Sequence, residues 1–232
     1  FRETYELALS AGDLLQAVWD IGSASLARAW NGDTEAAGRL AAEAFATAER
    51  SGSPTARAFA HFVRGEIAPP DDASAEEHLR RAIELAEMVD STLVIGLARV
   101  ALATLKARQD DAPGALHHYE AVIVEWQRVG AWTSQWVTLR TLVDLLVRVG
   151  ADRDAAILYG AVETARTGAR PFGADQAMLR GAATELNARL GEDTFRRFAA
   201  EGAILTENEV VTVALDAVHR ASAPRNGRPQ PR

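Results

Sequence analysis

The feature that most constrains the fold is a triplet of small or apolar residues that recurs at nearly constant distance along the chain. Within each triplet the residues are four and three apart, a spacing that places them on one face of a helix. The four triplets are Ala37/Ala41/Ala44, Ala75/Leu79/Ala82, Ala115/Tyr119/Val122 and Ala155/Tyr159/Val162. Their period is about 40 residues, within the range of known helical repeats. Such a period predicts helix pairs that stack, because one pair cannot bury its apolar face alone.

The composition favours the all-α class. Alanine, the strongest helix former, supplies 47 of the 232 residues. We find no alternating apolar segment bounded by hairpin residues. The sequence therefore predicts an all-α fold, a right-handed superhelical array of antiparallel helix pairs with a C-terminal helical cap. The array would be tetratricopeptide-like, although its period exceeds the ~34 residues of the standard unit.

We expect three regions along the chain. Residues 1–168 would form about four helix pairs, residues 169–221 the capping helices, and residues 222–232 a disordered tail. The first segment, residues 1–11, lacks an obvious earlier partner. We therefore expect Tyr5, Leu7 and Leu9 to present an exposed apolar face.

Several helix ends carry local markers. Small Gly160 should let a neighbouring helix approach closely, and Gly191 and Gly202 should end helices. The expected N-terminal markers are Ser53 followed by Pro54, Asp152 as an N-cap, and the capping boxes Ser74–Glu77 and Thr206–Glu209.

The last third of the chain resembles the C-terminal end of a family of actinobacterial signal-transducing P-loop ATPases. Those regulators have a long tetratricopeptide-like array, related in plan to the bacterial maltose regulator. Many end in a LuxR-type DNA-binding domain, and others begin with a nucleotide cyclase domain. The residues that carry the resemblance are Ala155, Ala156, Leu158, Gly160, Ala161, Glu163, Leu190, Gly191, Phe195, Gly202, Leu205, Glu209 and Leu215.

Charge and motifs exclude several classes of function for this segment. With a net charge of −7, the chain lacks the basic footprint of a nucleic-acid-binding domain. It has no cysteine, which excludes thiolate nucleophiles and Cys-ligated metals. Lys106, the single lysine, has no glycine-rich phosphate loop around it. We expect no enzyme activity, no bound cofactor and no membrane span, and a cytoplasmic location. ATP would bind only to the parent protein, and DNA only through a domain absent here.

Two kinds of polar cluster have simpler interpretations than a metal site. His117 and Glu120 share a helix face, but His118 diverges from its neighbour His117 by about 100°, and two ligands do not make a zinc site. The pairs Asp71–Asp72 and Asp110–Asp111 fall at turns between helices, where aspartate commonly caps.

The register of the repeat predicts a concave face lined by the first helix of each pair. Its expected partner-binding residues are Trp19, Arg57, Arg64, Arg140 and Asp144, with Val100 and Thr104 on the same side. Arginines there suit an acidic peptide or a phosphate. The competing interpretations are core packing for the tryptophan, and a solvated face or internal ion pairs for the charged residues.

These observations predict a binding module without catalysis. The resemblance implies a sensor and scaffold in a larger ATP-dependent transcriptional regulator, with a protein or small-molecule inducer and the parent ATPase domain as partners. Two alternatives remain open: a stand-alone tetratricopeptide adaptor that binds a peptide in its concave groove, and a regulatory array attached to a nucleotide cyclase. Because the chain begins with Phe1, we expect it to be a fragment or a processed product.

Overall fold

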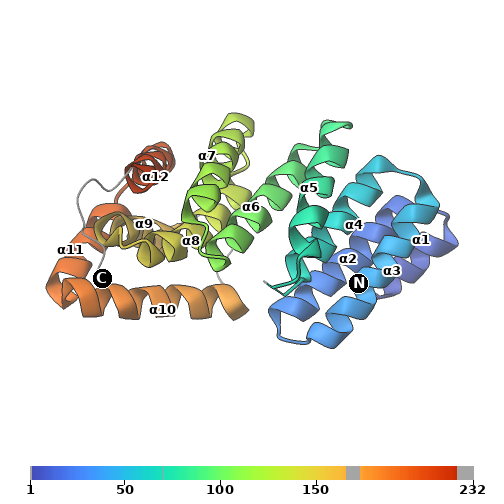
Figure 1. The fold of residues 1–232 in the computed structure, drawn as a ribbon, viewed down its shortest axis with the longest axis horizontal. Coiled ribbons are helices and arrows are strands. Elements are labelled where there is room, and N and C mark those ends of the chain that lie inside the picture. The colour runs from blue at the N-terminus through green and yellow to red at the C-terminus, as the bar shows by residue number, and fades with distance from the viewer. Residues whose placement is uncertain (1, 70, 166–172, 224–232) are drawn as a thin grey trace. The chain divides into compact units, whose positions relative to one another are not determined.

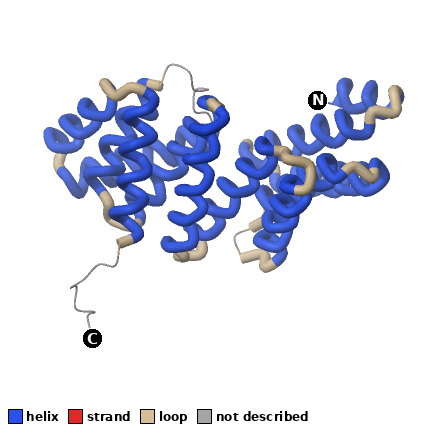
Figure 2. Tube along the Cα trace, turned by 90° about the horizontal axis from the view of Figure 1, so that it is seen from above, coloured by secondary structure: helices blue, strands red, loops and turns tan. Residues whose placement is uncertain are grey.

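The computed structural model describes residues 2–69, 71–165 and 173–223, and within these ranges every regular element is a helix (Figures 1 and 2). The all-α class is thereby confirmed. The helices are α1 (Arg2–Ser10), α2 (Leu14–Trp30), α3 (Thr34–Ser51), α4 (Pro54–Ile67), α5 (Ser74–Glu87), α6 (Thr92–Arg108), α7 (Ala112–Val129), α8 (Trp132–Arg148), α9 (Asp152–Thr164), α10 (Gly173–Leu190), α11 (Glu192–Ala203) and α12 (Glu207–Ser222). The start of the expected cap and residues 224–232 of the expected tail lie outside the described residues.

The chain divides into two compact units, Phe1–Asp111 and Ala112–Arg232. In the first unit, α2 pairs with α3 and α4 with α5, while α4 also packs against α2, α3 and α6. In the second unit, α8 packs against α7 and α9, α9 packs closely on α11, and α12 returns to α7. The boundary between the units falls within the region expected to hold the repeats.

The triplets that set the repeat lie in the cores of these units. Their members on α3, α5 and α7 are all buried, as are Ala155 and Val162 on α9. Only Tyr159 is partly exposed, and its ring lies 5.4 Å from that of Phe195. The periodic positions are therefore the positions at which each second helix meets its neighbours.

Among the described residues, a common turn follows six of the helices. In each, one residue has a positive φ and the amide N–H of the next residue donates to the carbonyl five positions earlier, the bond that defines a Schellman motif. The positive-φ residues are Gly12, Gly32, Asp90 (φ 51°), Asp110 (φ 59°), Gly130 and Gly150. The bonds run from the amides of Asp13, Asp33, Ser91, Asp111, Ala131 and Ala151. The interval between successive turns is the same from Gly12 to Gly32 as it is at each step from Asp90 to Gly150.

Helix α9 packs on α11 at backbone contact distance, as Gly160 predicted. A Cβ atom built on Gly160 would lie 1.9 Å from the carbonyl oxygen of Ala199, and one on Gly202 would lie 1.8 Å from that of Ile157. The prediction that Gly202 ends a helix is wrong, because α11 continues through it to Ala203. Its missing side chain permits interhelical contact instead of a helix stop.

The helix-end markers were only partly correct. Ser53 accepts the N–H of Ala56, with Pro54 at the first helical position, and Thr206 and Glu209 form the full capping box. Gly191 ends α10, as predicted.

Two of the N-cap predictions are wrong. At α5, Ala73 is the N-cap and no side chain caps the helix, because Asp72 accepts the N–H and the hydroxyl of Ser74 at 2.8 and 2.7 Å. This local turn competes with a capping box. Asp152 is the first residue of α9 and not its cap, and its carboxylate accepts from Arg189 at 2.9 Å.

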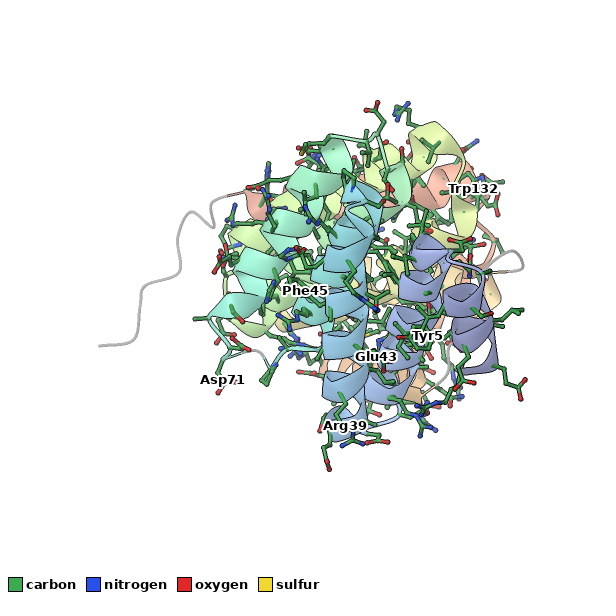
Figure 3. The ribbon with its side chains drawn as sticks, turned by 90° about the vertical axis from the view of Figure 1, so that its right-hand side faces the viewer. Tyr5, Arg39, Glu43, Phe45, Asp71 and Trp132 are labelled. Atoms are coloured by element: carbon green, nitrogen blue, oxygen red, sulfur yellow. The ribbon has the colours of Figure 1, made fainter. Side chains whose placement is uncertain are left out.

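The first helix is better covered than expected. Tyr5 is buried, and its hydroxyl donates to the carboxylate of Glu43 on α3 at 2.7 Å (Figure 3). Leu9 packs partly against the cluster that Tyr5 forms with α2 and α3. Only Leu7, with 70% of its surface exposed, matches the expectation. The prediction was wrong for Tyr5 because it considered only a packing partner that precedes α1 in the chain. The partners are α2 and α3, which follow α1.

Candidate functional site

The structure places the predicted residues of α2 and α4 in two different surroundings. Trp19 stacks on Phe59 of α4, with ring centroids 3.7 Å apart and planes at 24°. Arg57 forms an ion pair with Glu49 of α3 at 3.2 Å, and the Arg64 guanidinium lies 4.1 Å above the ring of Phe45, also on α3. Trp19 therefore contributes to packing between first helices, whereas both arginines contact the second helix of the preceding pair.

The predicted residues of the second unit are engaged within that unit. Arg140 is buried, with 3% of its surface exposed, and its guanidinium lies 3.9 Å from the carboxylate of Asp175 on α10. Burial lowers the pKa of Arg140, while Asp175 and Glu163 oppose this shift. Asp144 accepts a 2.7 Å hydrogen bond from Arg148 one turn later. A shared face that joins these residues to Arg57 and Arg64 remains a prediction.

A group of titratable side chains lies where α3, α4 and α5 meet. His61 of α4 and His78 of α5 face each other, with their Nδ1 atoms 2.9 Å apart, so that one ring donates and the other accepts. Phe45 of α3, labelled in Figure 3, meets both rings edge-on at 5.1 and 6.3 Å. We call Phe45, His61, Arg64 and His78 the histidine cluster.

Three structural features, on α4, at the turn after it and on α3, position the cluster. Arg57, His61 and Arg64 are four and three residues apart, so they form one stripe along α4. The turn after α4 reverses the chain and brings His78 of α5 opposite His61. Phe45 supplies an aromatic face on which the Arg64 guanidinium rests, an arrangement that holds an arginine in a fixed orientation.

The surroundings of the cluster disfavour a positive charge on either imidazole. Burial is the main cause that lowers the pKa of His61 to about 4, and His78, Arg81, Arg64 and Arg57 lower it further. Burial and Arg64 also lower the pKa of His78, although Glu77 and Asp72 act in the opposite direction. Both rings are therefore neutral at pH 7, and the electrostatic potential at His61 is positive.

This arrangement predicts that the folded chain loses stability in mild acid. A folded-state pKa below the ordinary value of 6.5 means that the contribution of His61 is complete above pH 6.5 and is lost as the pH falls towards 4. Because His61 keeps some contact with water, we expect a loss of only about 1–2 kcal/mol between pH 7 and 4.5. Urea unfolding followed by circular dichroism at several pH values measures it.

The matched variant for this experiment is His61→Gln. Its free energy of unfolding should change less with pH over the same interval, because the titrating ring is gone. An unchanged pH dependence in this variant would show that the acid sensitivity arises elsewhere.

Both histidines line an open hollow of about 620 Å³. The remaining lining residues come from α5 and the turn before it: Ala73, Glu76, Glu77, Arg80, Arg81 and Glu84. Most of these charges are already paired. Glu76 accepts from Arg80 and Lys106, and Arg81 donates to Glu84. Glu77 has no ion pair among the described residues.

Neither histidine was singled out from the sequence. The two rings are 17 residues apart, and only the reversal of the chain after α4 brings them together. The periodic pattern gave one indication of His61, because this residue falls on the same stripe of α4 as Arg57 and Arg64. The position of His78 depends on the exact length of the turn, which the pattern does not give.

No group of three potential metal-ligating side chains occurs within residues 2–69, 71–165 and 173–223. Glu120, which shares a helix face with His117, contacts His219 of α12 at 2.9 Å. None of the helices in these ranges is both long and apolar enough to cross a membrane. In comparisons with known proteins, no family model, curated protein or solved structure matches the chain.

Proposed function

We propose that the chain is a helical-repeat module that binds a protein or small-molecule partner and performs no catalysis of its own. Its helix pairs would form a right-handed superhelical array, with α10 to α12 as the cap. The single observation that carries this proposal is the burial of the periodic triplets on α3, α5, α7 and α9. Burial of equivalent positions in successive helix pairs is what a repeat array requires, and such arrays act by presenting surfaces.

We also propose that the module belongs to a larger ATP-dependent transcriptional regulator. The support is the resemblance of its last third to signal-transducing ATPases. Two residues of that resemblance, Gly160 and Gly202, make the backbone contact between α9 and α11. Glycines that a close backbone contact requires support a relationship between two sequences that share them, because few other residue types fit the same geometry. ATP would then bind to another domain, and inducer binding to the array would control it.

The mass of the native product tests this assignment. Antibodies raised against the purified chain should detect a polypeptide several times larger than 24.9 kDa in the cells that produce it. A native product close to 24.9 kDa would contradict the assignment to a large ATPase and favour a stand-alone adaptor. Micromolar ATP binding by the isolated chain would contradict the proposed absence of a nucleotide site.

A further inference from the structure

We propose that the histidine cluster is a binding site for a phosphate group, recognised by His61 and His78, which line the hollow beside α5, and by Arg64, whose guanidinium lies over Phe45 of the same cluster. This inference rests on the proposed function, since it names the chemical class of ligand that the module would take. The argument has three parts: the state of Arg64, the hydrogen-bonding capacity of the histidine pair, and the balance of charge around them.

Arg64 is prepared to bind an anion. Its guanidinium stacks on Phe45 at 4.1 Å, and it forms no ion pair with any carboxylate in the part of the chain that the structure describes. The neighbouring arginines differ in this respect, because Arg57 pairs with Glu49, Arg80 with Glu76 and Arg81 with Glu84. A stacked guanidinium with available N–H groups is the arrangement by which arginine binds oxyanions.

The histidine pair distinguishes a phosphate from a carboxylate. When the two neutral rings share a hydrogen bond through Nδ1, the accepting ring must carry its proton on Nε2 and the donating ring must have a free lone pair there. The pair therefore has one Nε2 donor and one Nε2 acceptor, on two rings that line the hollow. Neither Nε2 has a partner among the described residues. A carboxylate only accepts hydrogen bonds, whereas a phosphate with a P–OH group both donates and accepts.

The charges around the pair favour an anion over a cation. Arg57 and Arg64 on α4 and Arg81 on α5 make the potential at His61 positive. Glu49 on α3 is engaged by Arg57. Asp72 and Glu77 oppose the arginines near His78, and Asp72 is engaged by Ser74. Glu76 and Glu84 also line the hollow, but Arg80 and Lys106 engage Glu76 and Arg81 engages Glu84. Among the described residues, Glu77 is therefore the principal unpaired acid that weakens anion binding.

Inorganic phosphate is the probe for a first experiment. We expect the ring resonances of His61 and His78 to shift saturably with phosphate, at a dissociation constant on the order of 1 mM for so exposed a site. The Arg64→Met variant keeps an unbranched stem over Phe45 but loses the charge, and should bind at least about tenfold more weakly. Glu77→Gln should bind more tightly. Acetate should shift neither ring.

The matched control is Arg39→Gln on α3, which removes an arginine whose partner is Glu35 and leaves the cluster intact. It should bind phosphate like the parent chain. Unfolding curves of every variant separate lost binding from lost folding. Ring resonances that do not respond to phosphate, or that respond equally in Arg64→Met, would overturn the site. That result would leave the native mass, and hence the assignment to a larger regulator, untouched.

A second comparison identifies the source of the phosphate. The comparison is made near pH 6, where about half of a phosphate monoester still carries a P–OH group. O-phosphoserine that binds more tightly than a sugar phosphate would indicate a phosphorylated side chain as the ligand. The opposite order would indicate a small phosphorylated metabolite. Either order requires binding through the phosphate group and supports the site, whereas weaker binding of both than of acetate would contradict it.

Discussion

Replacing Gly202 by alanine should destabilise the second unit by about 3 kcal/mol or more, the upper end of the cost of overpacking. The new Cβ would lie 1.8 Å from the carbonyl oxygen of Ile157 and 3.0 Å from the amide nitrogen of Ala161, both on α9. Backbone atoms in a helix cannot rotate away as a side chain can, so α11 must move off α9 and lose its buried contacts. Gly160→Ala should have a similar effect, because its Cβ would meet the backbone of Ala199.

Chemical denaturation followed by circular dichroism measures these changes. Gly181→Ala on α10 is the matched control, since a Cβ there meets nothing within 4 Å. That substitution should be neutral or stabilise the chain by up to about 1 kcal/mol through helix propensity. If Gly202→Ala behaved like Gly181→Ala, the close approach of α9 and α11 would be incorrect.

Truncating Trp126 to alanine should cost about 3–5 kcal/mol, the range for removal of a large buried aromatic side chain. Trp126 is among the largest fully buried side chains in the described residues, with 2% of its surface exposed. Its indole N–H donates to the hydroxyl of Thr138 on α8 at 3.1 Å. The loss therefore combines a cavity between α7 and α8 with one missing hydrogen bond.

Two further variants divide this effect into its parts. Trp30 is 44% exposed at the end of α2, so Trp30→Ala should change the free energy of unfolding by less than about 1 kcal/mol. Trp126→Phe keeps most of the apolar contact and should recover more than half of the loss. Equal costs for Trp126→Ala and Trp30→Ala would show that Trp126 is not a core residue.

The sequence predicted the helices and their buried faces because those depend on periodicity alone. Each triplet needs only the helical repeat and a neighbour to pack against, and its position does not depend on the length of any particular turn. Gly160 was also correctly interpreted, since a small residue on a buried stripe has few other uses. Asp152 and Ser74 were not, because several polar groups near each helix start compete for the same donors, and a spacing rule cannot rank them.

The candidate site was predicted less well. Arg57 and Arg64 were both assigned to the concave face, but their contacts with Glu49 and Phe45 depend on the rotation of α4 about its axis. A shift of one residue turns a helical side chain by about 100°, which separates one groove from the next. The contact between His61 and His78 depends in addition on how the chain reverses between α4 and α5.

The six Schellman turns give the chain a unit of length that is independent of what any helix packs against. A helix and the turn that follows it together span the same number of residues from Gly12 to Gly32 and at each step from Asp90 to Gly150. If one such helix and turn were gained or lost, every later first helix of a pair would become a second helix, and every second helix a first. A gain or loss of two units preserves that order. Related chains should therefore differ in length by whole pairs, and shorter insertions should be confined to turns that lack the motif, such as the longer connection between α4 and α5.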